Sequence, residues 1–252
     1  MITNLSAGMD AEANAKLERL IAATRSLAPS QIHRLDDDHV LVAIPLTSAQ
    51  PARRAQVAVA ATRSDDIPYK DITEVQPQHL AQAIRLSKTF EPAIDRNTLE
   101  MDLGKALDIV QQNQTMTVVG TLNTTVVEHE NKVEATVDKV LAILLEAFQL
   151  ALSAPLKTAL TAAVTNTFTN LTTQEGGAWI FYQSSTSTNC TYVYNILFAV
   201  QNDKTGGVML ALPISYKITV NKDKKTVLFI TLKDVADYSV EIKGVRVAQI
   251  LE

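Results

Sequence analysis

The stretch 208-VMLALPISYKITV-220 decides how this chain folds. Every even-numbered position in it is apolar, whereas the odd-numbered positions include Pro213, Ser215, Lys217 and Thr219. An apolar residue at every second position indicates a β-strand, because successive side chains of a strand point to opposite faces. The sequence therefore predicts a long two-faced strand over residues 208–220.

Further strand patterns surround this stretch. Residues 191–201 carry one apolar face, and the turn 202–207 (NDKTGG) has the composition of a hairpin. Strands are also predicted over 40–46, 56–61, 115–127, 226–233 and 238–251. The alternation of the last strand slips at Gly244, and a β-bulge is the simplest account of that slip.

Helical patterns dominate the middle of the chain. Pro77 suits a first helical turn, Pro92 ends the first pattern, and a second pattern over 99–110 has Asn97 or Thr98 as its N-cap. Two more helices are predicted over 133–148 and 156–171, and a short amphipathic helix over 11–27. The chain thus places its helices first and its antiparallel strands afterwards. This is an α/β protein with the α+β order of elements, and its helices form two hairpins.

Composition excludes several classes of function. The 252 residues have a formal net charge of −4, so no broad positive field suits nucleic acid. Cys190 is the single cysteine and is expected to be a packed or partly exposed strand residue. The first twenty residues lack a basic start and an apolar core, so no secretory signal is predicted and release would use another route. No stretch reaches the roughly 18 apolar residues of a membrane-spanning helix.

Motifs for catalysis or cofactor binding are scarce. The sequence has no nucleotide-binding glycine cluster, no nucleophile elbow and no zinc-binding motif. Four histidines are scattered, and the run from His33 to His39, with Asp36, Asp37 and Asp38, is more readily a solvated loop than a metal site. We therefore predict no catalytic residue, no metal, no cofactor and no enzymatic activity.

The two long strand patterns have the length that a membrane demands. A transmembrane β-strand needs about 9 to 11 residues with one apolar face, which residues 191–201 and 208–220 both provide. An antiparallel sheet that is covered by helices gives the same alternation, and by pattern alone this ordinary core is favoured.

Several motifs resemble the Cyt cytolysins, which are cytolytic δ-endotoxins of bacterial insecticidal crystals. They are LTAAVTNTFTNL (160–171) followed by AWIF (178–181), AQAIRL (81–86), YNILFA (194–199), TGGVM (205–209) and LFIT (228–231), in the same order as in the family. The resemblance covers residues 56–251. It implies a single-domain cytolysin fold, in which two helical hairpins flank a mainly antiparallel sheet.

The resemblance also implies a mechanism. A soluble insecticidal protoxin would lose a leader at residues 1–54 by cleavage at Arg53, Arg54 or Arg63, leaving a cytolysin domain at 55–252. It would act outside the producing cell, bind membrane phospholipids directly, self-associate and insert strands. The residues expected to insert are Tyr192, Tyr194, Ile196, Phe198, Val200, Val208, Leu210, Leu212, Ile214, Tyr216, Ile218, Val220, Val227 and Phe229.

Alternatives remain at this point. A lipid- or glycan-binding module could use the same fold without lysis, with the polar loop 184–189 contacting headgroups or sugars. Damage could come from discrete pores or from a detergent-like layer of protein. An exposed strand at 40–46 or 56–61 could also pair two protoxin copies edge to edge.

Overall fold

The computed structural model describes residues 31–34, 39–46, 77–148, 154–169, 171–172, 180–202 and 208–250. A seven-stranded antiparallel sheet has the order β1-β2-β5-β6-β7-β3, and β4 pairs with β5 beside this path. The strands are β1 (Gln31–Arg34), β2 (His39–Pro45), β3 (Met116–Lys132), β4 (Ile180–Ser185), β5 (Cys190–Asn202), β6 (Val208–Val220) and β7 (Val235–Ile250). The helices are α4 (Pro77–Phe90), the 3₁₀ turn η1 (Glu91–Ala93), α5 (Leu103–Gln111), α6 (Val133–Phe148), α7 (Ala154–Phe168) and α9 (Lys224–Leu228).

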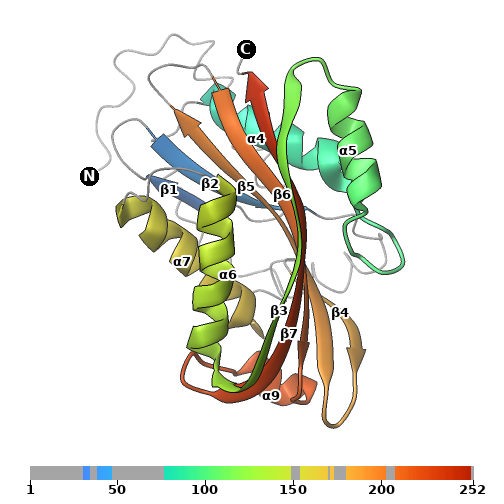
Figure 1. Ribbon diagram of the computed structural model, residues 1–252, viewed down its shortest axis with the longest axis vertical. Coiled ribbons are helices and arrows are strands. Elements are labelled where there is room, and N and C mark those ends of the chain that lie inside the picture. Colours follow the sequence, from blue (N-terminus) through green and yellow to red (C-terminus); the bar gives the residue numbers. More distant parts are fainter. Residues whose placement is uncertain are drawn as a thin grey trace, which may run out of the picture.

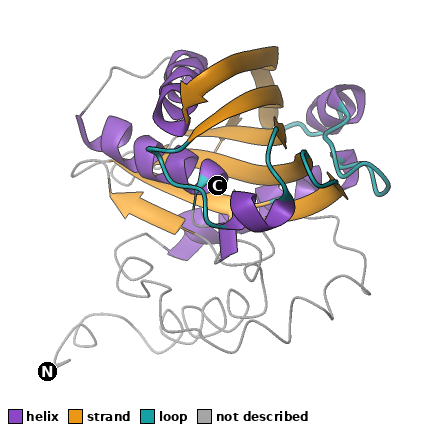
Figure 2. Ribbon diagram, turned by 90° about the horizontal axis from the view of Figure 1, so that it is seen from below, coloured by secondary structure: helices purple, strands orange, loops and turns teal. Residues whose placement is uncertain are grey.

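Helices cover both faces of the sheet (Figures 1 and 2). On one face Tyr194 and Tyr216 pack in a core with Leu144 of α6 and Leu160 of α7. The opposite face forms a second core, in which α4 and α5 pack on the half of the sheet remote from α9. The predicted fold class is confirmed, since two helical hairpins flank an antiparallel sheet.

Gly244 marks the point where β7 changes its buried face. Tyr238 and Ile242, before Gly244, belong to the core under α6 and α7, whereas Val245 and Val247, after it, belong to the core under α4 and α5. The pairing of β7 with β6 and β3 passes through Gly244 without a register shift. The predicted bulge at Gly244 is therefore wrong, because a change of covered face broke the apolar alternation.

The bulge nearest to this point lies on β3. The register with β7 shifts between Val118 and Gly120, and shifts again between Glu128 and Asn131. The predicted strand at 115–127 is confirmed, and it continues to Lys132, where α6 follows directly. Because residues 128–132 all have polar side chains, they lack the apolar alternation that signals a strand.

The start of the second helix differs from its prediction. Its N-cap is Asp102, whose carboxylate accepts a hydrogen bond from the Lys105 amide at 3.1 Å. Asn97 and Thr98 instead donate their amides to Asp95, in a turn that leads to Leu99 with a positive φ of 62°. The predicted caps are wrong because this turn precedes the helix.

Residues 226–233 are not a strand. Asp223 caps α9 by accepting hydrogen bonds from the Thr226 amide at 3.0 Å and from its hydroxyl at 2.9 Å. Val227 and Ile230 are buried three residues apart, which is helical spacing, while Phe229 between them is exposed. The predicted strand is wrong because capping by Asp223 favours a helical turn over an extended chain.

The N-terminal strand at 40–46 is confirmed as β2. It pairs with β5 along Ile196–Asn202 and with β1 on its other side, and Leu46 is fully buried. β2 is therefore no exposed edge, which corrects the expectation that it could pair two copies edge to edge. The predicted helix at 11–27, the strand at 56–61 and the turn at 202–207 lie outside the described residues, apart from Asn202.

Candidate functional site

The central strands β5 and β6 carry a continuous apolar band on one face. Their register pairs Tyr194 with Tyr216 and Phe198 with Leu212, so the even-numbered side chains of both strands lie side by side. The band consists of Cys190, Tyr192, Tyr194, Ile196, Phe198, Val200, Leu210, Leu212, Ile214, Tyr216, Ile218 and Val220. In this folded form α6 and α7 cover the band, and every member except Leu210 is buried.

A hydrogen bond joins the band to α7. The Tyr192 hydroxyl donates to the Thr167 carbonyl of α7 at 3.0 Å. Beside it, the rings of Phe168 and Tyr238 meet edge to face, with centroids 5.8 Å apart. Apolar side chains of both helices also pack over the band, and this packing has no directional preference.

Some polar atoms in this core lack partners among the residues that the structure describes. They are the hydroxyls of Thr136, Tyr216 and Tyr238. A buried hydroxyl without a hydrogen bond costs about 1–3 kcal/mol. The contact between the sheet and the α6–α7 layer is thus weaker than its apolar area suggests.

Backbone groups at both ends of α6 are hydrogen-bonded, at the N-terminus to the connection between β6 and β7 and at the C-terminus to β7. At the N-terminus, the Val133 amide donates to the Asp234 carbonyl at 3.0 Å and the Glu134 amide to the Leu232 carbonyl at 3.1 Å. At the other end, the Arg246 guanidinium on β7 donates to the Ala147 carbonyl and to the Val119 carbonyl at the β3 bulge. These contacts satisfy helix-end groups that have no partner within the helix.

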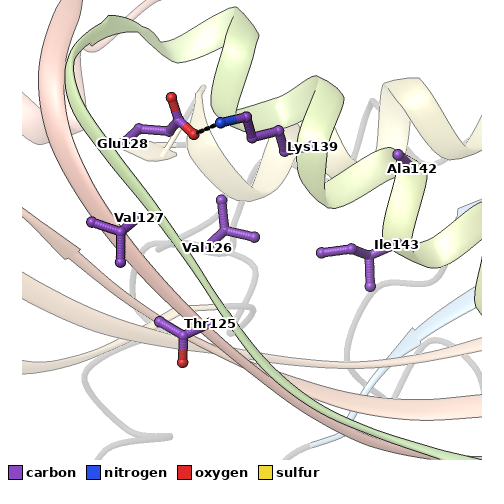
Figure 3. A pocket seen from close by; sticks show the side chains of 7 residues that line it. All are labelled: Thr125, Val126, Val127, Glu128, Lys139, Ala142 and Ile143. Atoms are coloured by element: carbon purple, nitrogen blue, oxygen red, sulfur yellow. Dashed lines mark hydrogen bonds and ion pairs between the residues drawn. The ribbon is translucent and has the colours of Figure 1, made fainter.

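A shallow hollow of about 400 Å³ separates part of α6 from β3 (Figure 3). Its apolar lining includes Val126, Val127 and Ile143, and an ion pair between Glu128 and Lys139 lies at one end. The hydrogen bonds from Lys139 and Asn131 lower the pKa of Glu128. The hollow shows that packing between α6 and β3 is incomplete along this seam.

The opposite face of the strands is polar near the α9 end. Lys217 of β6 and Lys243 of β7 contact the Glu100 carboxylate at 3.1 and 2.9 Å, and Lys217 also lies 3.4 Å from Glu241. Burial alone raises the pKa of Glu100, but hydrogen bonds from the two lysines outweigh it and lower the pKa. This network holds the turn before α5 on the sheet.

The structure brings together most of the residues expected to insert. The band contains all of those on β5 and β6 except Val208, whose side chain is not described. Val227 is buried in the same core from α9, whereas Phe229 is 74% exposed and does not join it. Arg53, Arg54 and Arg63 lie outside the described residues, and Cys190 is a buried strand residue as predicted.

No described helix is both long enough and apolar enough to cross a bilayer. A family model described as Bacillus thuringiensis toxin matches residues 47–252. The chain belongs to this family, and its place is among the cytolytic δ-endotoxins.

Two relatives illustrate the match in sequence. The type-1Ba cytolytic δ-endotoxin of Bacillus thuringiensis subsp. neoleoensis is 38% identical over 210 residues, which is 79% of this chain and 79% of the relative. The type-2Ba cytolytic δ-endotoxin of subsp. israelensis is 39% identical over 197 residues, or 78% of this chain and 75% of the relative. The resemblance seen in the motifs is confirmed.

Solved structures agree with this placement. The activated Cyt2Ba monomer from Bacillus thuringiensis subsp. israelensis superposes with a TM-score of 0.66 at 40% identity, covering 71% of this chain and 95% of that one. A second solved structure, described as a δ-endotoxin, gives the same TM-score at 38% identity over 71% of this chain and 79% of its own.

Sequence reasoning missed the residues that tie the layers together. Arg246 and Glu100 are single charged residues in apolar or mixed stretches, and no local pattern marks their distant partners. The cap of α9 did carry a signal, because Asp223 and Thr226 have the three-residue spacing of a helix N-terminus.

Proposed function

We propose that this chain is a cytolytic toxin that permeabilises membranes by placing β5 and β6 into the bilayer. The observation that carries the proposal is the apolar band, with partners in register over both strands and covered by helices on one side. Each strand has 13 residues, and about 9 to 11 suffice to span the hydrocarbon core. The function named for the relatives supports the same reading.

Insertion requires α6 and α7 to leave the band. In water the band needs cover, because exposing about a dozen large apolar side chains costs roughly 25 cal/mol for each Å². In a bilayer, lipid tails replace the helices as the apolar surroundings, so the cost of uncovering the band falls. On the reverse face, Lys217, Thr191, Ser215 and Thr219 near the α9 end of the two strands would then line a polar interior.

Strands in lipid must satisfy their backbone groups with one another. An open sheet edge leaves N–H and C=O groups unpaired where no water can reach them. Several copies must therefore join edge to edge and close on themselves, so self-association in the membrane is part of the proposal. Phospholipid is the proposed partner, and the protein would act outside the cell that makes it.

Proteolysis would activate the protein. A cut at Arg53, Arg54 or Arg63 would separate the leader at 1–54 from the cytolysin domain at 55–252. Because β2 lies in the leader, the cut would leave it without a covalent link to the domain. Since β2 occupies one edge of β5 along Ile196–Asn202, its departure would open that edge for another copy.

The second candidate is a non-lytic binding module. The tip of the β4–β5 hairpin supports it, because residues 184–189 are exposed and bear hydroxyl and amide groups. A pure binder would leave vesicles sealed.

Dye release from phosphatidylcholine vesicles tests the proposal. We expect release only after limited trypsin digestion, with mass spectrometry locating the cut between Arg53 and Arg63. Vesicle binding without release in either state would favour the binding module. Full release by the uncut chain would contradict activation while leaving permeabilisation intact.

A further inference from the structure

We infer that the connection between β6 and β7, residues 221–234, is the surface that first contacts the phospholipid bilayer, with Phe229 as its apolar anchor. This inference rests on the proposed function and names the part of the molecule that would bind the membrane first. The connection contains α9 and lies at one end of the molecule, beside the tip of the β4–β5 hairpin (Figure 1).

Phe229 is the first observation. It is 74% exposed, the largest exposure of any large apolar side chain that the structure describes, and Val235 at the end of the same connection is 49% exposed. Their neighbours Val227 and Ile230 are buried in the core. The connection therefore buries some of its apolar side chains and exposes others. Aromatic side chains favour the boundary between headgroups and acyl chains.

The charges around Phe229 suit lipid phosphates. The connection 221–234 contains the four lysines Lys222, Lys224, Lys225 and Lys233 and two acidic residues, Asp223 and Asp234, whose carboxylates accept hydrogen bonds from threonines of the same connection. Asp223 is engaged in capping α9, while Lys225 and Lys233 are exposed. A long lysine stem can lie along an apolar surface while its ammonium reaches a phosphate. An apolar anchor between lysines fits the interface of a bilayer.

The connection holds Phe229 in a fixed place. Asp223 brackets the start of α9, and Asp234 accepts hydrogen bonds from the Thr231 amide at 2.7 Å and its hydroxyl at 2.9 Å. Asn221 and Asp237 join the two strand ends through bonds of 2.7 and 2.8 Å. A surface that is already ordered loses little conformational entropy on binding.

The same connection caps α6. The carbonyls of Leu232 and Asp234 accept the first two amides of that helix, three and five residues after Phe229. Movement of the connection into the headgroup region would therefore withdraw the cap from α6. Contact with lipid is in this way coupled to release of the helix that covers the apolar band.

The test compares variants of the trypsin-activated protein on phosphatidylcholine vesicles, with binding measured by sedimentation and release by dye. Phe229→Ala should raise the lipid concentration for half-maximal binding about tenfold, since burying a Phe side chain contributes roughly that factor. Phe229→Trp should bind within about twofold of the wild type, because tryptophan also favours the interface. Thermal unfolding should be unchanged, as Phe229 packs on nothing in the core.

Ile250→Ala is the matched control. Ile250 is 59% exposed at the opposite end of β7, so its truncation should leave binding unchanged. If Phe229→Ala binds as tightly as the wild type, or if Ile250→Ala loses binding equally, the inference is overturned. The proposed function still holds in either case if the activated wild type releases dye. A self-association in solution that Phe229→Ala abolishes, with vesicle binding intact, assigns the surface to a second copy and also overturns it. Activated wild type that neither binds nor releases dye overturns both proposals.

Discussion

Gly244 of β7 allows a close approach to the backbone of β6. A Cβ atom at this position would lie 2.9 Å from the Pro213 carbonyl oxygen, closer than real Cβ contacts. Gly244→Ala should therefore lower the free energy of unfolding by about 1–3 kcal/mol, because β6 and β7 must move apart. Gly120→Ala is the control, since its Cβ would meet only the Arg246 side chain at 3.4 Å. Denaturant unfolding measures both, and equal stability of the two variants would contradict the close approach.

Glu100 makes stability depend on pH. Its pKa in the folded chain lies below the ordinary value of 4.5, so the folded state binds fewer protons there than the unfolded state. The stabilisation is complete above that value and is lost as pH falls through the lowered pKa. Glu100→Gln should reduce stability at neutral pH by about 1–3 kcal/mol and flatten its acid dependence.

Exposed Glu146 on α6 provides the control for Glu100. Glu146→Gln should keep the pH profile of the wild type in thermal unfolding from pH 7 downward. If Glu100→Gln retains that profile as well, the contacts with Lys217 and Lys243 do not stabilise the fold.

Two tyrosines of the apolar band differ in one hydrogen bond. Tyr192 donates to Thr167, whereas the Tyr216 hydroxyl has no partner among the described residues. Tyr192→Phe should therefore destabilise the protein by about 1 kcal/mol, and Tyr216→Phe should be neutral or stabilising by up to about 1 kcal/mol. Guanidinium unfolding of the pair is its own control. Equal destabilisation by both changes would mean that Tyr216 is hydrogen-bonded.

Among the elements, those with long periodic patterns were predicted well. The helix at 133–148 and the strand at 208–220 agree with α6 and β6 in both bounds. The errors fall where a side chain outweighs the pattern, as Asp223 does at α9 and Asp102 at α5. Propensity and periodicity describe a segment in isolation, but a cap or a change of covered face depends on specific neighbours.

The candidate site follows the same division. The members of the apolar band on β5 and β6 could be read from alternation, because the strand period fixes which side chains share a face. The ties on α6 could not, because Arg246 reaches Ala147 across 99 residues of sequence. Long-range partners of this kind leave no local pattern.

Arg246 joins the end of α6 to β7 and β3. Replacing it by Met keeps the side-chain length but removes the bonds to the end of α6 and to the β3 bulge. Arg246→Met should lower stability by about 1–3 kcal/mol and speed dye release from vesicles, because α6 leaves the sheet more easily. Arg85→Met, on exposed Arg85 of α4, is the control. Slower release by a folded Arg246→Met protein would contradict a restraining role for α6.

At the scale of the whole molecule, the two helical layers differ in how they pack on the sheet. The α4–α5 layer packs on one half of the sheet, and the Glu100 network anchors its connecting turn on polar positions. The α6–α7 layer covers the apolar band itself and borders the hollow beside β3. This asymmetry leads us to expect that α6 and α7 separate first on a membrane.

Hydrogen–deuterium exchange of the activated protein on leaking phosphatidylcholine vesicles tests the central claim most directly. We expect the amides of α6 and α7 to exchange faster than in solution, while those of β5 and β6 stay protected by pairing within the membrane. Complete dye release with α6 and α7 as protected as in solution would contradict the claim that these helices must leave the strands.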